Sequence, residues 1–166
     1  MKSTASFLLL ILLLAYAVAG AMDGVEGPKD CNQCGMDRAA YARSRMIVVY
    51  ADGTTVGVCS LHCAAVELQR HRDKQVTAFM VADYITHELI DARTAAWVVG
   101  GRQAGVMTAV PKWAFAGKEA AREFIEKNGG IVNSFDLALK LATMEVQDRA
   151  AEEKAVEREM LHELRQ

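Results

Sequence analysis

All four cysteines of the chain lie within 33 residues, as two pairs: Cys31 with Cys34, and Cys59 with Cys63. A Cys-x-x-Cys turn lets two sulfur atoms converge on one metal ion, and two pairs from separate elements are the usual source of a four-sulfur site. Cys59 and Cys63 straddle a predicted junction between a strand and a helix, so both sulfurs face the same side if the helix begins at Ser60. The spacing therefore predicts a metal site that ties two parts of the fold together.

Two further side chains near these pairs are candidate ligands. Met36 follows Cys34 by two residues, and a thioether is a good Cu(I) ligand but a poor zinc ligand. A single methionine also commonly fills a hydrophobic core. His62 adjoins Cys63 and points elsewhere on a regular helix, so a surface or capping role is the alternative to ligation. In an oxidising compartment, two disulfides are a second interpretation of the four cysteines.

The N-terminal residues 1–21 are predicted to be a signal peptide rather than part of a fold. Lys2 supplies a positive charge, Phe7–Ala19 is apolar, and small residues suited to cleavage follow. The apolar stretch is shorter than the about 20 residues that a membrane-spanning helix needs. We therefore expect export to the periplasm with cleavage, an uncleaved membrane anchor being the alternative. Residues 22–30 are predicted to be a polar linker.

The remaining chain is predicted to form one compact metal-binding domain, residues 31–146, followed by a tail. With 19 basic and 21 acidic residues, the formal net charge of the chain is −2. Nucleic-acid-binding proteins present a basic stripe, so nucleic acid is excluded as an expected partner. Residues 147–166 are dense in charge and are predicted to be a solvated helical tail, the alternative being a helix that docks on a partner.

The pattern along residues 31–146 predicts two small ββα-type units, about 31–74 and 75–146. In the first, an Asp-Gly pair between two β-branched runs predicts a hairpin of Met46–Tyr50 and Thr54–Val58, followed by a helix over 60–72. In the second, strands are predicted at 76–81, 95–99 and 106–110, with a connection over 83–91. A helix over 118–128 ends at Gly129-Gly130, and Ser134 caps a final helix. The predicted fold class is α+β.

Several separate motifs, in order along about residues 30–138, resemble the NosL family of nitrous oxide reductase accessory proteins. The matching segments begin at Cys31-Asn-Gln-Cys34-Gly-Met36-Asp37 and continue with Asp83-Tyr84-Ile-Thr86, Ile90-Asp91-Ala92, Ala96-Trp97-Val98-Val99-Gly100, Gly105-Val-Met107-Thr-Ala-Val-Pro111, Ala114-Phe115-Ala-Gly-Lys118-Glu-Ala-Ala121 and Phe124-Ile-Glu-Lys-Asn-Gly129-Gly130.

The resemblance implies a periplasmic Cu(I)-binding metallochaperone that is not itself an enzyme. Its partners would be the nitrous oxide reductase apoprotein and a copper donor, with the membrane involved only if the signal segment is retained. Its fold would consist of ββα-type units similar to the organomercurial lyase MerB. The family's copper ligands fall on Cys34 and Met36, and Met107 matches a further family methionine.

The chain departs from many family members at Cys59 and Cys63, which those members lack. The second pair leaves two other functions open. Four thiolates can close a structural Zn(II) site in a protein-interaction domain. A thiol-dependent enzyme is the third hypothesis, because Cys-x-x-Cys also occurs as a redox motif.

Overall fold

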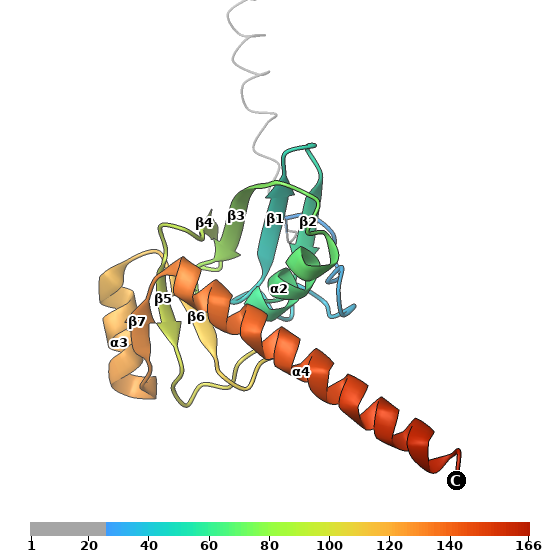
Figure 1. Cartoon of the computed structure of the whole chain (residues 1–166). Helices are drawn as coiled ribbons and strands as arrows, with labels where there is room; N and C mark the ends of the chain where they lie inside the picture. The colour runs from blue at the N-terminus through green and yellow to red at the C-terminus, as the bar shows by residue number, and fades with distance from the viewer. Residues whose placement is uncertain (1–25) are drawn as a thin grey trace, which may run out of the picture.

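The computed structural model describes residues 26–166 as two small antiparallel sheets with helices packed on them (Figure 1). One sheet has the strand order β2-β1-β3-β4 and the other has the order β6-β5-β7. The predicted signal peptide lies outside the described residues. In chain order the elements are β1 (Met46–Tyr50), β2 (Thr55–Val58), α2 (Leu61–Arg70), β3 (Val76–Ala82), β4 (Leu89–Asp91), β5 (Ala96–Val99), β6 (Lys112–Phe115), α3 (Lys118–Asn128), β7 (Ile131–Asn133) and α4 (Phe135–Glu163).

The hairpin of β1 and β2 forms where the Asp-Gly pair predicts it. Met46, Val48 and Tyr50 of β1 point into the core, whereas the residues between them are half-buried. This alternation is the two-residue period of a strand with one face inward. The turn closes because the Asp52 carboxylate accepts a hydrogen bond from the Thr54 amide at 2.8 Å and Gly53 adopts a φ of 83°. The helix α2 follows at once and covers this sheet.

The α+β class and the ββα rhythm are confirmed, and the structure adds how the two halves join. Strand β3 pairs with β1, and β4 pairs with β3, so the first sheet continues past the unit boundary predicted between residues 74 and 75. The predicted connection over 83–91 therefore contains a strand, β4. The second sheet, with α3 packed against it, encloses a smaller core that includes Trp113, Phe115 and Phe124.

The strand predicted over 106–110 is wrong. These residues form an irregular loop, and the strand lies further on, in β6. Met107 has a φ of 60°, a left-handed conformation that breaks strand pairing. The Thr108 hydroxyl lies 2.9 Å from the Val110 carbonyl and also within hydrogen-bonding distance of the Glu145 carboxylate, and its single proton is shared between these acceptors. This contact fastens the loop to α4. The β-branched residues of this segment favour a strand, but local hydrogen bonds determine its path.

The helix α4 runs on well past the body of the protein (Figure 1). The Ser134 hydroxyl accepts a hydrogen bond from the Leu137 amide, as predicted for an N-cap. The first half of α4 packs on α2 and β5 through Phe135, Ala138, Ala142 and Val146. Residues 151–166 are all exposed, so the predicted solvated tail is helical as far as Glu163. Along residues 26–166 no helix combines the length and the apolar character needed to cross a membrane.

Candidate metal centre

The four cysteine sulfurs, which the sequence places in two separate pairs, meet at one point. Their Sγ atoms all lie within 4.8 Å of one another, and all four cysteines are free thiols. Cys59 Sγ is 3.5 Å from Cys34 Sγ and 3.6 Å from Cys63 Sγ. Metal–sulfur bonds of about 2.3 Å in a tetrahedron would separate the sulfurs by about 3.8 Å. The cluster is therefore dimensioned to hold one thiophilic metal ion, and the two-disulfide interpretation does not describe it.

The first pair is held by a tight turn directly before the hairpin. The Cys31 amide donates to the Met36 carbonyl at 2.8 Å, and the Gly35 amide donates to the Cys31 carbonyl at 2.9 Å. Gly35 adopts a φ of 74°, where a residue with a Cβ is strained. The Asn32 amide donates to the Gly57 carbonyl at 3.0 Å, which fixes this turn to β2. The turn therefore presents its sulfurs toward the end of β2.

The second pair comes from the junction that the sequence predicts. Cys59 directly follows β2, and Cys63 lies in the first turn of α2, which begins at Leu61. The extended backbone of Ser60 starts the helix, so the two sulfurs lie on the same side, four residues apart. The end of a strand and the start of a helix thus position one ligand each, and both elements belong to the main core.

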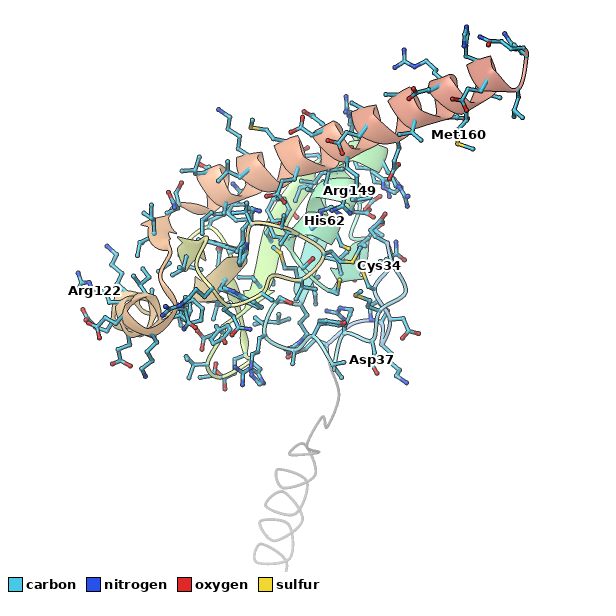
Figure 2. All side chains as sticks on the ribbon, turned by 90° about the horizontal axis from the view of Figure 1, so that it is seen from below. Cys34, Asp37, His62, Arg122, Arg149 and Met160 are labelled. Atoms are coloured by element: carbon cyan, nitrogen blue, oxygen red, sulfur yellow. The ribbon has the colours of Figure 1, made fainter. Side chains whose placement is uncertain are left out.

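The four cysteines differ in access to solvent. Cys31, Cys59 and Cys63 are buried, with exposed fractions of 3%, 0% and 1%, whereas Cys34 is partly exposed. Figure 2 shows Cys34 at the margin of the body, with sulfur atoms gathered beside it. A metal ion held here would be enclosed on three sides. Cys34 is therefore the ligand that an incoming molecule reaches first.

Hydrogen bonds among the thiols distribute the protons of the metal-free cluster. The thiols of Cys59 and Cys63 donate hydrogen bonds to the Cys31 sulfur, and these bonds hold the pKa of Cys31 far below its usual value. The same bond to Cys31 raises the pKa of Cys59 to about 12, and bonds to Cys31 and Cys59 raise the pKa of Cys63. Cys31 is therefore the thiolate, and it accepts hydrogen bonds from the neutral thiols of Cys59 and Cys63. A metal ion that binds all four sulfurs has to displace the remaining protons.

A fully buried arginine, which the sequence analysis did not identify, supports the cluster. Arg38 has no exposed surface, and its guanidinium donates only to backbone carbonyls, among them those of Pro28 at 2.7 Å and Val58 at 3.3 Å. Burial lowers the pKa of Arg38, while the charge of the Cys31 thiolate acts to raise it. A positive charge at this depth favours an anionic metal–thiolate centre. The sequence feature that indicates this buried side chain is Gly57. A Cβ atom at position 57 would lie only 2.8 Å from Arg38 Cζ, so the close packing requires glycine there.

A buried carboxylate holds the first cysteine turn against α2. Glu67 is 1% exposed, accepts a hydrogen bond from Tyr50 Oη at 2.9 Å and lies 3.0 Å from His71 Nδ1. Its second oxygen accepts from the amide of Gln33, the residue directly before Cys34. The Gln33 Oε1 in turn accepts from Arg70 Nη1 at 2.7 Å. The helix that carries Cys63 therefore also clamps the loop between the other two ligands.

The remaining predicted ligands lie around the cluster without joining the four-cysteine group. Met36 and Met107 are half-buried and pack against the hydrophobic core that contains three of the cysteines. His62 is 6% exposed, so the surface role that its position favoured is wrong. Its ring lines the same hollow as Arg149 of α4 (Figure 2), and burial lowers its pKa. Ligation by these three side chains stays a prediction.

Comparisons with known proteins agree with this architecture. The crystal structure of the copper chaperone NosL from Shewanella denitrificans superposes with a TM-score of 0.55 at 24% sequence identity, over 68% of this chain and 91% of that chain. This likeness shows a shared fold. A search of curated proteins gives no match. The NosL family model matches residues 24–138, more than half of the sequence. The chain is therefore a member of the NosL family.

Proposed function

We propose that the chain is a copper metallochaperone that binds Cu(I) at its cysteine cluster and passes it to a recipient enzyme. The observation that carries the proposal is the asymmetry of the cluster: three buried sulfurs and one, on Cys34, that is partly exposed. Thiolates select soft ions such as Cu(I). Membership of the NosL family, and the likeness to a copper chaperone from Shewanella denitrificans, support copper as the cargo.

Transfer would proceed by ligand exchange at the exposed sulfur. A soft ligand of the recipient would bind the copper ion while the buried thiolates still hold it, and the Cys34–copper bond would then break. Further ligands of the recipient would replace the remaining thiolates one at a time, so that the ion leaves with every Cys–copper bond exchanged. No oxidation state changes, and the chain performs no enzymatic reaction. Arg38 limits the build-up of negative charge as thiolates gather on the ion. The hydrogen bond between Gln33 and Glu67 holds the Cys31–Cys34 turn in place while Cys34 dissociates from the ion.

The recipient that the NosL family suggests is nitrous oxide reductase, and the place of transfer is the periplasm. The predicted signal peptide over residues 1–21 supports export. A copper donor would load the chain before it meets the recipient. Met36 and Met107, which lie against the same core as the cysteines, are proposed as thioether ligands used during loading or release.

The second candidate function is a structural zinc site, and one observation favours it. All four cysteines converge at spacings that suit a tetrahedral Zn(II) ion, and three of them are inaccessible. Such a site would stabilise the fold, and the function would then lie in contacts with other proteins. The copper-chaperone and structural-zinc functions differ in whether the bound metal ion can be transferred to another protein.

Copper transfer to metal-free nitrous oxide reductase tests the proposal directly. Full-length chain loaded with Cu(I) under anaerobic conditions is mixed with the apoenzyme, and the two are separated and assayed for copper. We expect copper to move to the enzyme, more slowly for Cys34→Ser and for Met36→Leu. Met80→Leu is the matched control, because Met80 lies on β3 away from the cluster. Copper that stays on the chain at equilibrium would contradict the proposal.

A further inference from the structure

The projecting end of α4 carries an apolar face that no part of the described chain covers. Val156, Met160, Leu161 and Leu164 are between 49% and 82% exposed and lie along one hollow of the surface. We call this surface the α4 groove; its polar members are Arg149, Glu152, Glu153 and Glu157. Figure 2 shows Met160 far from the body of the protein. Exposed apolar side chains in such a continuous row mark a contact surface.

Charges on this helix are distributed unevenly around its axis. At about 100° per residue, Glu153 and Glu157 fall within the apolar face, and Glu152 and Glu163 fall along one of its edges. Lys154 and Arg165 lie near the opposite edge, and Arg158 lies on the back. The hollow itself is lined by three glutamates and one cation, Arg149, so the α4 groove combines apolar side chains with a net negative charge.

The three glutamates of the α4 groove have no ionic partner within the described chain. No ion pair among residues 26–166 involves a side chain beyond Glu145. Like charges also stand four residues apart along the helix, for example Asp148 with Glu152 and Glu153 with Glu157. Such pairs destabilise an isolated helix. Positive charge brought by another molecule would relieve this repulsion.

We propose that the α4 groove binds a basic amphipathic helix of another protein. Leucine-like side chains of that helix would cover Val156, Met160 and Leu164, and its lysines or arginines would face the glutamates that line the groove. A second copy of this chain is a poorer occupant, because two grooves of net negative charge would then face each other. An anionic membrane surface is disfavoured for the same reason. The inference concerns a different surface from the cysteine cluster and holds for either metal.

Two synthetic peptides of about 20 residues test the charge requirement. Both have leucine at positions i, i+3, i+4 and i+7; one carries lysine and arginine beside the leucines and the other carries glutamate. Fluorescence anisotropy with the full-length chain should give binding at least roughly tenfold tighter for the basic peptide, and weaker binding as salt is added. Equal affinities, or no binding of the basic peptide, would overturn the proposal.

Variants on the two sides of the helix locate the site. Met160→Gln should weaken binding of the basic peptide roughly tenfold, and the pair Glu153→Lys with Glu157→Lys should reverse the preference between the peptides. Arg158→Gln on the back of the helix is the matched control and should change nothing. These positions are exposed, so circular dichroism should show an unchanged thermal transition. Self-association or binding to anionic vesicles that Met160→Gln abolishes would also overturn the proposal.

Discussion

Replacing Glu67 by glutamine tests how the metal centre is supported without touching a ligand. The buried carboxylate accepts hydrogen bonds from Tyr50 Oη and from the Gln33 amide, and His71 Nδ1 lies 3.0 Å away. Glutamine has the same shape, but only one of its two terminal atoms accepts. If its amide nitrogen faced Gln33, two donors would meet, and Gln33 cannot simply turn over because its own oxygen accepts from Arg70. If the nitrogen faced Tyr50 instead, the Tyr50 hydroxyl would have to stop donating and accept.

The loss of stability in Glu67→Gln can be worked out from the hydrogen bonds that Glu67 makes. A hydrogen bond to a charged acceptor contributes about 1.5–3 kcal/mol, and a buried donor left without a partner costs a similar amount. In either orientation Glu67→Gln loses one hydrogen bond to a charged acceptor and puts a neutral amide among partners arranged for a carboxylate. We therefore expect the free energy of unfolding of the metal-free chain to fall by about 2–3 kcal/mol.

Urea unfolding of the reduced, metal-free protein measures this loss, and hydrogen exchange locates it. The amides of residues 31–35 should exchange faster in Glu67→Gln, because the loop is no longer clamped to α2. Glu126→Gln on the exposed face of α3 is the matched control and should cost less than about 0.5 kcal/mol. If Glu67→Gln is as stable as this control, or if the loop amides are unaffected, the assigned role of the clamp is wrong.

Three further predictions concern the core beneath the site and its protons. Gly57→Ala should destabilise the chain by about 1–3 kcal/mol, because its Cβ would collide with the buried Arg38, and thermal unfolding measures this. Met46→Leu should lower stability by less than about 1.5 kcal/mol with unchanged metal affinity, since Met46 is a core residue, and competition with a Cu(I) chelator checks this. Because the pKa values of Cys59 and Cys63 are raised, metal binding at neutral pH releases at least these two protons, and affinity should increase at least about a hundredfold per pH unit. An affinity independent of pH between about 6 and about 8 would contradict that proton assignment.

Most elements of this fold could be predicted because their signals are local. The Asp-Gly turn gives the hairpin, the alternation in Met46–Tyr50 gives its inward face, and Ser134 gives the start of α4. The failures depend on contacts distant in sequence. Strand β4 is only three residues long and exists through its pairing with β3. Three of residues 106–110, Val106, Thr108 and Val110, are β-branched, but the hydrogen bond from Thr108 to Glu145 of α4 prevents a strand.

The candidate site divides in the same way. Convergence of the two cysteine pairs could be predicted from their spacing and from the junction at Ser60. The buried polar support could not, because Arg38 and Glu67 find their partners across many residues of sequence. Gly57 inside a strand is the one local sign, since a glycine there marks a close approach. The burial of His62 depends on α4, more than 70 residues away.

The measurement that tests the central claim most directly is a competition between metals on the anaerobically reduced full-length chain. Protein loaded with one equivalent of Zn(II) is titrated with Cu(I) held by a chromophoric chelator, while the zinc released is followed with a second dye. The account predicts that one Cu(I) displaces the zinc, and that Cys34→Ser weakens this copper binding. Zinc that remains bound at one ion per chain in the presence of excess Cu(I) would contradict it, and would identify the cluster as a structural site.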